Sequence, residues 1–344
     1  MQLDLPPGDH LNGPAIPVHT MGPIEACGEV LPVPGGRAHL WPPMDPFGHR
    51  LQLFTGKGGV GKSTVVAAMA LRAAAQGHRP LVVELGHRAT MESLFGVPVG
   101  YEPREVGGGV SAMNMALEDA LLDYVAGQVR VRRLAGRIVS NPTLARFFRA
   151  APAVAEVVTL HKLAQLVAAG EHHPIFVDLD ATGHALMFLA LPEVFEGLAT
   201  AGPLRAVLER TTTLLRDHER TVLHLVTVPA PLPIQETREL YAKLKADARV
   251  RLGALIVNRV PRRPLAASEE VALDALGEEA APDVALARRQ LRRVARAARA
   301  VEELRTLGPP LLPLPELPPF EGERAPAALA QLGAILQRAM EAAP

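Results

Sequence analysis

One short stretch carries the residues best suited to chemistry. Gly56-Lys-Gly-Gly-Val-Gly-Lys-Ser-Thr64 places four residues between two glycines and then a lysine and a serine. Glycines let backbone N–H groups close around phosphate oxygens, a lysine reaches the β- and γ-phosphates, and a serine hydroxyl is a ligand for Mg²⁺. An ordinary glycine turn before a helix is the alternative. We take the pattern as a phosphate-binding loop for a nucleoside triphosphate.

The residues on either side of the loop supply the strand and helix that such a loop requires. Leu51-Gln-Leu-Phe-Thr55 is an apolar run typical of a buried strand, and residues 62–76 form an alanine-rich helical stretch that Gly77 ends. The helix N-terminus adds positive potential for an anion. We expect the whole motif to contact the nucleotide: Gly56, Lys57, Gly58, Gly59, Val60, Gly61, Lys62, Ser63 and Thr64.

Apolar runs and helical stretches alternate from residue 51 onward. This alternation predicts an α/β fold, a mostly parallel sheet with helices on both faces. Residues 1–49 are rich in Pro and Gly and predict a flexible arm, whereas residues 50–344 predict a single domain. Within it, residues 116–170 read as a helical insertion and 193–220 as a helical segment. Further strands are expected at residues 80–85, 110–115, 174–179, 221–228, 252–258 and 311–315, helices at 233–247 and 325–342, and a loop at 86–96.

Asp178 stands at the end of the apolar run at residues 174–179. P-loop enzymes place an acid associated with Mg²⁺ on a strand beside the loop, and Asp178 is the candidate for that acid. The alternative is a strand-end aspartate that caps the next helix.

Composition limits the class of protein. Of 344 residues, 48% are hydrophobic and 21% charged, with a formal net charge of zero, so nothing global favours nucleic acid or anionic lipid. The single cysteine, Cys27, allows no intrachain disulfide and fits a reducing compartment. We find no apolar run of membrane-spanning length and no signal peptide, and therefore expect a cytoplasmic protein.

The motifs together resemble a known family. Lys57 directly after the first glycine resembles the deviant Walker A motif of the ArsA/MinD/ParA class of dimeric P-loop ATPases. Asp178-Leu-Asp-Ala-Thr-Gly-His184 resembles switch II of the ArsA branch, which includes the eukaryotic tail-anchored-protein targeting ATPase. Ile256-Val-Asn-Arg-Val260 and Leu312-Pro-Leu-Pro315 also resemble that branch, and the paired ArsA-like ATPases of some bacteria are most similar.

The resemblance implies an ATP- and Mg²⁺-dependent ATPase that works as a homodimer, or as a heterodimer with an ArsA-like paralogue. Its helical insertion would lie between switch I and switch II. Lys57 would contact phosphate on the facing subunit, and Lys62 the phosphates of its own. Ser63 and Asp178 would hold the metal. Asn258 would hydrogen-bond adenine, and the backbone around Pro313 and Leu314 would line the same pocket.

Switch I departs from the family pattern. Gly86 stands where the family has the aspartate that orients the attacking water, and Glu84 lies two residues earlier in a predicted strand. Asp180 occupies a switch II position from which it could reach the γ-phosphate. Two interpretations stay open: a slow ATPase that uses Asp180, or a hydrolysis-deficient regulatory subunit paired with an active paralogue. A ParA/MinD-like positioning ATPase is a further alternative.

The resemblance leaves the partner open. Arsenite would need several thiolates, and no C-x-x-C zinc pair is present, so we expect neither site. The last helix has little positive charge, which favours membrane contact only through a partner. A helix expected around residues 288–299 carries arginines without interleaved aromatics, so we expect these to be solvated or paired with the acidic helix beside them rather than bound to nucleic acid. Apolar residues of the helical segments form either core or a groove for a protein client.

Overall fold

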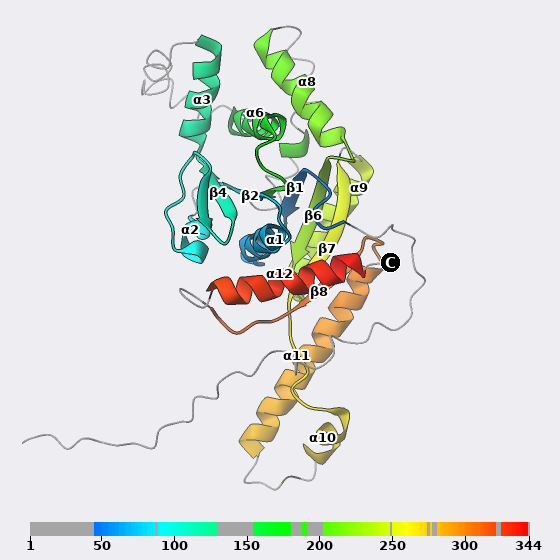
Figure 1. The fold of residues 1–344 in the computed structure, drawn as a ribbon. Helices are drawn as coiled ribbons and strands as arrows, with labels where there is room; N and C mark the ends of the chain where they lie inside the picture. The colour runs from blue at the N-terminus through cyan, green and yellow to red at the C-terminus, as the bar shows by residue number, and fades with distance from the viewer. Residues whose placement is uncertain are drawn as a thin grey trace, which may run out of the picture. The chain divides into compact units, whose positions relative to one another are not determined.

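A mostly parallel sheet organises the part of the chain that the computed structural model describes, residues 45–86, 89–129, 154–179, 188–190, 202–247, 250–273, 276, 281–320 and 325–342 (Figure 1). Its eight strands run in the order β3-β4-β2-β5-β1-β6-β7-β8, and every neighbouring pair is parallel except β3 with β4. This confirms the predicted α/β fold. The strands are β1 (Leu51–Thr55), β2 (Leu81–Leu85), β3 (Arg104–Gly107), β4 (Val110–Met115), β5 (Ile175–Asp178), β6 (Thr221–Thr227), β7 (Arg251–Val260) and β8 (Leu311–Pro315).

Helices bury both faces of this sheet. One core cluster joins the strands to α1 (Lys62–Ala75), α2 (Thr90–Phe95) and α12 (Ala325–Glu341), and α1 and α12 lie side by side (Figure 1). The other cluster contains residues of α3 (Leu117–Val129), α6 (Val154–Ala169), α8 (Pro203–Arg216), α9 (Pro231–Asp247) and α11 (Ala281–Arg305). The short α10 (Ala267–Ala272) precedes α11. No helix among the described residues is long and apolar enough to span a membrane.

Burial on both faces explains why the central strands are continuously apolar. Side chains of successive residues point to opposite faces of a sheet, so Phe54 joins the cluster of α1 while Leu53 joins that of α6. All five residues of β1 are buried. A strand of this kind has no solvent face and shows no alternation in its sequence.

The structure adds two elements that the sequence did not predict. β3 is a short antiparallel edge strand that pairs with β4 and has little apolar alternation. Residues 90–95, expected as loop, form α2. Of the predicted insertion and helical segment, α3, α6 and α8 are described, and residues 130–153 and 191–201 lie outside the described residues.

The predicted arm meets the sheet at its last residues. Pro46 and Phe47 are buried, and the Gln52 side chain donates from Nε2 to the carbonyl oxygen of Pro46 at 2.9 Å. Residues 45–49 are therefore part of the packed domain. Residues 1–44, which include Cys27, lie outside the described residues.

A polar cluster connects the segment after α2 to the helical layer. Asp123 of α3 accepts hydrogen bonds at Oδ2 from Lys162 Nζ at 2.9 Å and from the Tyr101 hydroxyl at 3.1 Å. The Lys162 ammonium group also lies 4.8 Å from the centre of the Tyr101 ring. Burial and the neighbouring Asp123 carboxylate raise the pKa of Tyr101, which keeps its hydroxyl a donor. The cluster thus joins α3 and α6 to the chain leaving α2.

His224 is a buried titratable group on β6. It is 1% exposed, its ring stacks on Phe54 with centres 4.9 Å apart, and its Nδ1 accepts a hydrogen bond from the Ala254 N–H at 3.0 Å. Burial lowers the pKa of His224 from 6.5 to about 3. The folded protein therefore holds a neutral imidazole.

As the pH falls, the His224 imidazole is protonated at a higher pH in the unfolded chain than in the folded protein. His224 should therefore make folding stability depend on pH. Above pH 6.5 both states are neutral, and stability falls as the pH drops from 6.5 towards 3. We expect a loss of about 2 kcal/mol between pH 7 and pH 5 from this group alone. His224→Asn keeps an acceptor for Ala254 and cannot titrate. Urea unfolding at the two pH values should show a smaller pH effect in the variant by that amount, and an equal effect in both proteins would contradict the assignment.

Candidate functional site

Buried polar side chains gather at one edge of the sheet. The strands β2, β5, β1, β6 and β7 are consecutive neighbours, and each carries a buried polar residue at or near its carboxyl end. Ligands of open parallel sheets bind outside this edge, so these strand ends mark the candidate site. The residues are Glu84, Asp178, Thr55, Thr227 and Asn258.

The glycine-rich loop, residues 56–61, leaves β1 at this edge and enters α1. Gly61 precedes the helix with a φ of 90°, and no side chain caps the first turn, which contains no acidic residue. Lys62 lies folded over the loop, where Nζ donates to the carbonyl oxygens of Gly56 at 3.2 Å and Lys57 at 3.4 Å. Uncapped N–H groups at a helix start, next to an ammonium group, form an arrangement that attracts an anion.

Ser63 and Asp178 meet directly beside this loop. The Ser63 hydroxyl donates to Asp178 Oδ2 at 2.5 Å, and Asp178 is 6% exposed. A hydroxyl and a carboxylate are hard oxygen donors, which fit Mg²⁺ completed by phosphate oxygens and water. The described residues contain no group of three or more His, Cys, Asp or Glu side chains placed to hold a metal. Two oxygen ligands from protein suit a cation whose other ligands come from phosphate and water.

Lys57 is directed away from the loop. Its Nζ forms an ion pair with Glu236 Oε1 of α9 at 2.6 Å, and the two side chains are each 32% exposed. Lys57 and Lys62 therefore point to different partners although both come from one motif. The sequence could not place Glu236, which lies 179 residues away along the chain.

Asn258 is bonded to the loop itself. Its Nδ2 donates to the Val60 carbonyl at 2.9 Å, and its Oδ1 accepts from the Arg259 N–H at 2.9 Å. A Cβ on Gly61 would lie 2.4 Å from Asn258 Nδ2, so only glycine permits this approach. In the next strand Pro313 pairs with Val257 in the sheet register, and Leu314 is buried. The three residues expected around adenine thus share one end of the sheet.

The Glu84 carboxylate is hydrogen-bonded to neighbouring groups of the protein. The residue is 2% exposed, and its carboxylate accepts from the Thr90 N–H at 2.8 Å, the Met91 N–H at 3.5 Å and Asn114 Nδ2 at 3.3 Å. The first two donors belong to the start of α2, so Glu84 serves this helix as a capping residue would. Gly86 follows β2, and a Cβ there would meet nothing within 4 Å. Asp180 and His184 lie outside the described residues.

Two buried hydroxyls at the site had no signal beyond their position. Thr55 and Thr227 end β1 and β6, and neither Oγ1 has a hydrogen-bond partner within the described part of the chain. Only their place as the last polar residue of an apolar run would have identified them.

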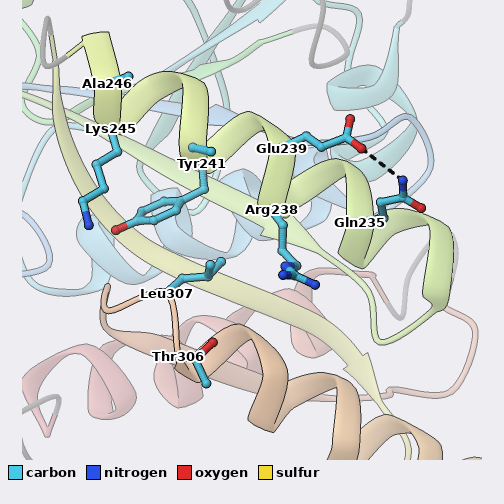
Figure 2. A pocket seen from close by; sticks show the side chains of 9 residues that line it. Gln235, Arg238, Glu239, Tyr241, Lys245, Ala246, Thr306 and Leu307 are labelled. Carbon is cyan, nitrogen blue, oxygen red and sulfur yellow. Dashed lines mark hydrogen bonds between the residues drawn. The ribbon is translucent and has the colours of Figure 1, made fainter.

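A hollow lies on the flank of α9, and Figure 2 shows its lining. Gln235, Arg238 and Tyr241 come from α9, and Leu307 follows α11. Arg238 is paired with Glu303, and Lys245 lies over the Tyr241 ring at 5.8 Å from its centre. Both positive side chains of this hollow thus already contact protein groups.

Comparison with known proteins agrees with this geometry. Residues 49–202 match the ArsA family, described as anion-transporting ATPases. The ATPase BagA of Mycobacterium tuberculosis is 35% identical over 245 residues, 65% of this chain and 69% of that protein. The ATPase GET3C of Arabidopsis thaliana is 22% identical over 304 residues, 74% of this chain and 75% of its own length. A putative arsenical pump-driving ATPase of Halobacterium salinarum is 26% identical over 226 residues, 61% of this chain and 35% of its own. These matches agree with the P-loop at the carboxyl end of β1, and the chain belongs to the ArsA family of P-loop ATPases.

Proposed function

We propose that this chain is a cytoplasmic, ATP-binding, Mg²⁺-dependent ATPase that acts as a nucleotide-controlled dimer and engages a protein partner. The observation that carries the proposal is the joint position of Lys62, the uncapped start of α1 and the Ser63–Asp178 pair. Each of these suits a different part of a metal–triphosphate: the phosphate oxygens, their negative charge and the cation.

Nucleotide binding would exchange protein contacts for ligand contacts. The Lys62 ammonium group would move from the carbonyls of Gly56 and Lys57 to the β- and γ-phosphates, while loop amides hold the phosphate oxygens. Ser63 and Asp178 would hold Mg²⁺, which neutralises phosphate charge when bound. The side-chain amide of Asn258 would form a hydrogen bond with adenine, and Pro313 and Leu314 would lie beside the base.

The dimer proposal gives Lys57 a second partner. In the single chain this lysine is held by Glu236, so a contact with phosphate on a facing subunit requires the ion pair to open. Formation of the dimer would therefore compete with an intrachain contact. An exposed pair of this kind contributes about 0.2–1 kcal/mol, which makes it a weak restraint.

A second candidate function is an ATP-binding regulatory subunit with little hydrolysis. Two observations favour it. Gly86 has no carboxylate, and the carboxylate of Glu84 accepts hydrogen bonds from backbone N–H groups at the start of α2. An attacking water needs an acceptor to be held in line. Asp180 is the remaining acid that we propose for that task.

Nucleotide binding is tested by removing the Lys62 charge. We expect Lys62→Ala to raise the Kd for Mg-ATP at least about thirtyfold, because a charge-assisted hydrogen bond of about 2 kcal/mol is lost. Isothermal titration calorimetry measures this, and Lys243→Ala, an exposed position on α9, is the matched control. Equal affinities in the unmodified chain and in Lys62→Ala would refute the proposal.

Dimerisation is tested at Lys57 and Glu236. Lys57→Ala should abolish any dimer that depends on ATP, because a charge facing the opposite phosphate is lost. Glu236→Gln should shift the dimer midpoint to a protein concentration up to about fivefold lower, because the competing ion pair is gone. Sedimentation velocity with Mg-ATP and with no nucleotide measures both. A dimer that forms equally with and without nucleotide, or one that Lys57→Ala leaves unchanged, would argue against a contact between Lys57 and phosphate on the facing subunit.

Hydrolysis is tested by adding the missing acid. Gly86→Asp should raise phosphate release about tenfold or more if the absent carboxylate limits the rate. Gly96→Asp is the control for backbone strain, since Gly86 has a φ of 96° and Gly96 a φ of 69°, a Cβ has open space at both, and Gly96 ends α2. A fast unmodified enzyme that Gly86→Asp does not improve and Asp180→Asn inactivates would assign the acid to Asp180 instead.

A further inference from the structure

The strand that carries Asn258 has an irregularity next to the P-loop. In the β7–β8 pairing, Val257 is opposite Pro313 and Val260 is opposite Pro315, so Asn258 and Arg259 together face one residue of β8. Arg259 has a φ of 57°, the only positive φ of a non-glycine residue within the described ranges. Such a bulge redirects a side chain and is common beside active sites.

The redirected side chain lies against the loop. A terminal nitrogen of the Arg259 guanidinium is 3.9 Å from the position that a Cβ of Gly61 would occupy. The side-chain amide of Asn258 connects β7 to the loop, since it accepts a hydrogen bond from the Arg259 N–H and donates one to the Val60 carbonyl. The bulge is therefore fixed to the loop through Asn258, and the Arg259 side chain lies beside the residue that opens α1.

The charge of Arg259 is not used by the described part of the protein. Its guanidinium has no hydrogen bond or ion pair there, and the residue is exposed. Other arginines of the region are engaged: Arg263 with Glu270 and Arg293 with Glu316. A left-handed backbone costs free energy that glycine would avoid, and strain of this kind gathers at binding sites.

We propose that Arg259 is a further nucleotide-binding residue whose guanidinium pairs with the phosphates of the bound nucleotide. The inference rests on the proposed function of the P-loop. A guanidinium presents a planar fork of N–H donors that matches phosphate oxygens, and it keeps its charge at any physiological pH. Beside Gly61, this charge would add to Lys62 from the β7 side of the loop.

The test compares ATP affinity in matched variants of the full chain by calorimetry. Arg259→Ala should raise the Kd for Mg-ATP about tenfold, and Arg259→Lys should recover part of that loss. Arg251→Ala, at the other end of the same strand, should bind as the unmodified chain does. Repeating the titrations at low and high salt should show a weaker salt dependence for Arg259→Ala, because one charge fewer faces the phosphates.

Two readouts separate binding from folding. Arg259→Gly should unfold at the same or a higher temperature than the unmodified chain without nucleotide, since it relieves the backbone, yet lose ATP affinity as Arg259→Ala does. ATP binding that is equal in the unmodified chain and Arg259→Ala would overturn the inference and leave the proposed function standing. An unchanged salt dependence would also overturn it, because a contact with the base alone would explain the loss. An unmodified chain that binds no ATP would remove the proposed function and this role together.

Discussion

The parallel pairing of β1 with β5 and β6 is the constraint on which the site depends. It places the end of β1 between Asp178 and Thr227, so the loop that leaves β1 emerges among polar strand ends. The chain must then turn into α1 within a few residues, which requires glycine at Gly61, where Asn258 comes too close for a Cβ. Sheet register, loop backbone and helix start are thus set by one packing arrangement.

A second property follows from the contacts within the site. Three of the side chains that we assign to the ligand already have a protein partner: Lys62 contacts the loop carbonyls, Ser63 contacts Asp178, and Lys57 contacts Glu236. The contacts of Lys62 and Ser63 hold these side chains beside the loop and reduce the ordering that binding must supply, whereas the Lys57–Glu236 pair must open. The Ser63–Asp178 and Lys57–Glu236 contacts join this segment to β5 and α9, and the Asn258–Val60 bond joins it to β7. Exchange of these contacts for ligand contacts is therefore a direct route by which nucleotide would alter the surface around α9.

The sequence predicted the local features well and the distant ones poorly. Strand–loop–helix around the P-loop, β4 and β8 follow from apolar runs and glycine placement, which act over a few residues. The Lys57–Glu236 pair, the use of Glu84 by α2 and the bulge at Arg259 depend on which segments meet in space. β3 lacks apolar alternation because it is an exposed edge strand. No spacing rule encodes such contacts, so side chains with clear chemistry acquire their partners only from the fold.

The most direct measurement is an experimental structure of the full chain with Mg²⁺ and a non-hydrolysable ATP analogue. We predict that Lys62 Nζ lies within hydrogen-bond distance of the β- and γ-phosphates and no longer contacts the carbonyls of Gly56 and Lys57. We also predict that Ser63 Oγ ligates the metal with Asp178 beside it. A nucleotide bound elsewhere, while Lys62 keeps its contacts with the loop carbonyls, would contradict the proposed nucleotide site.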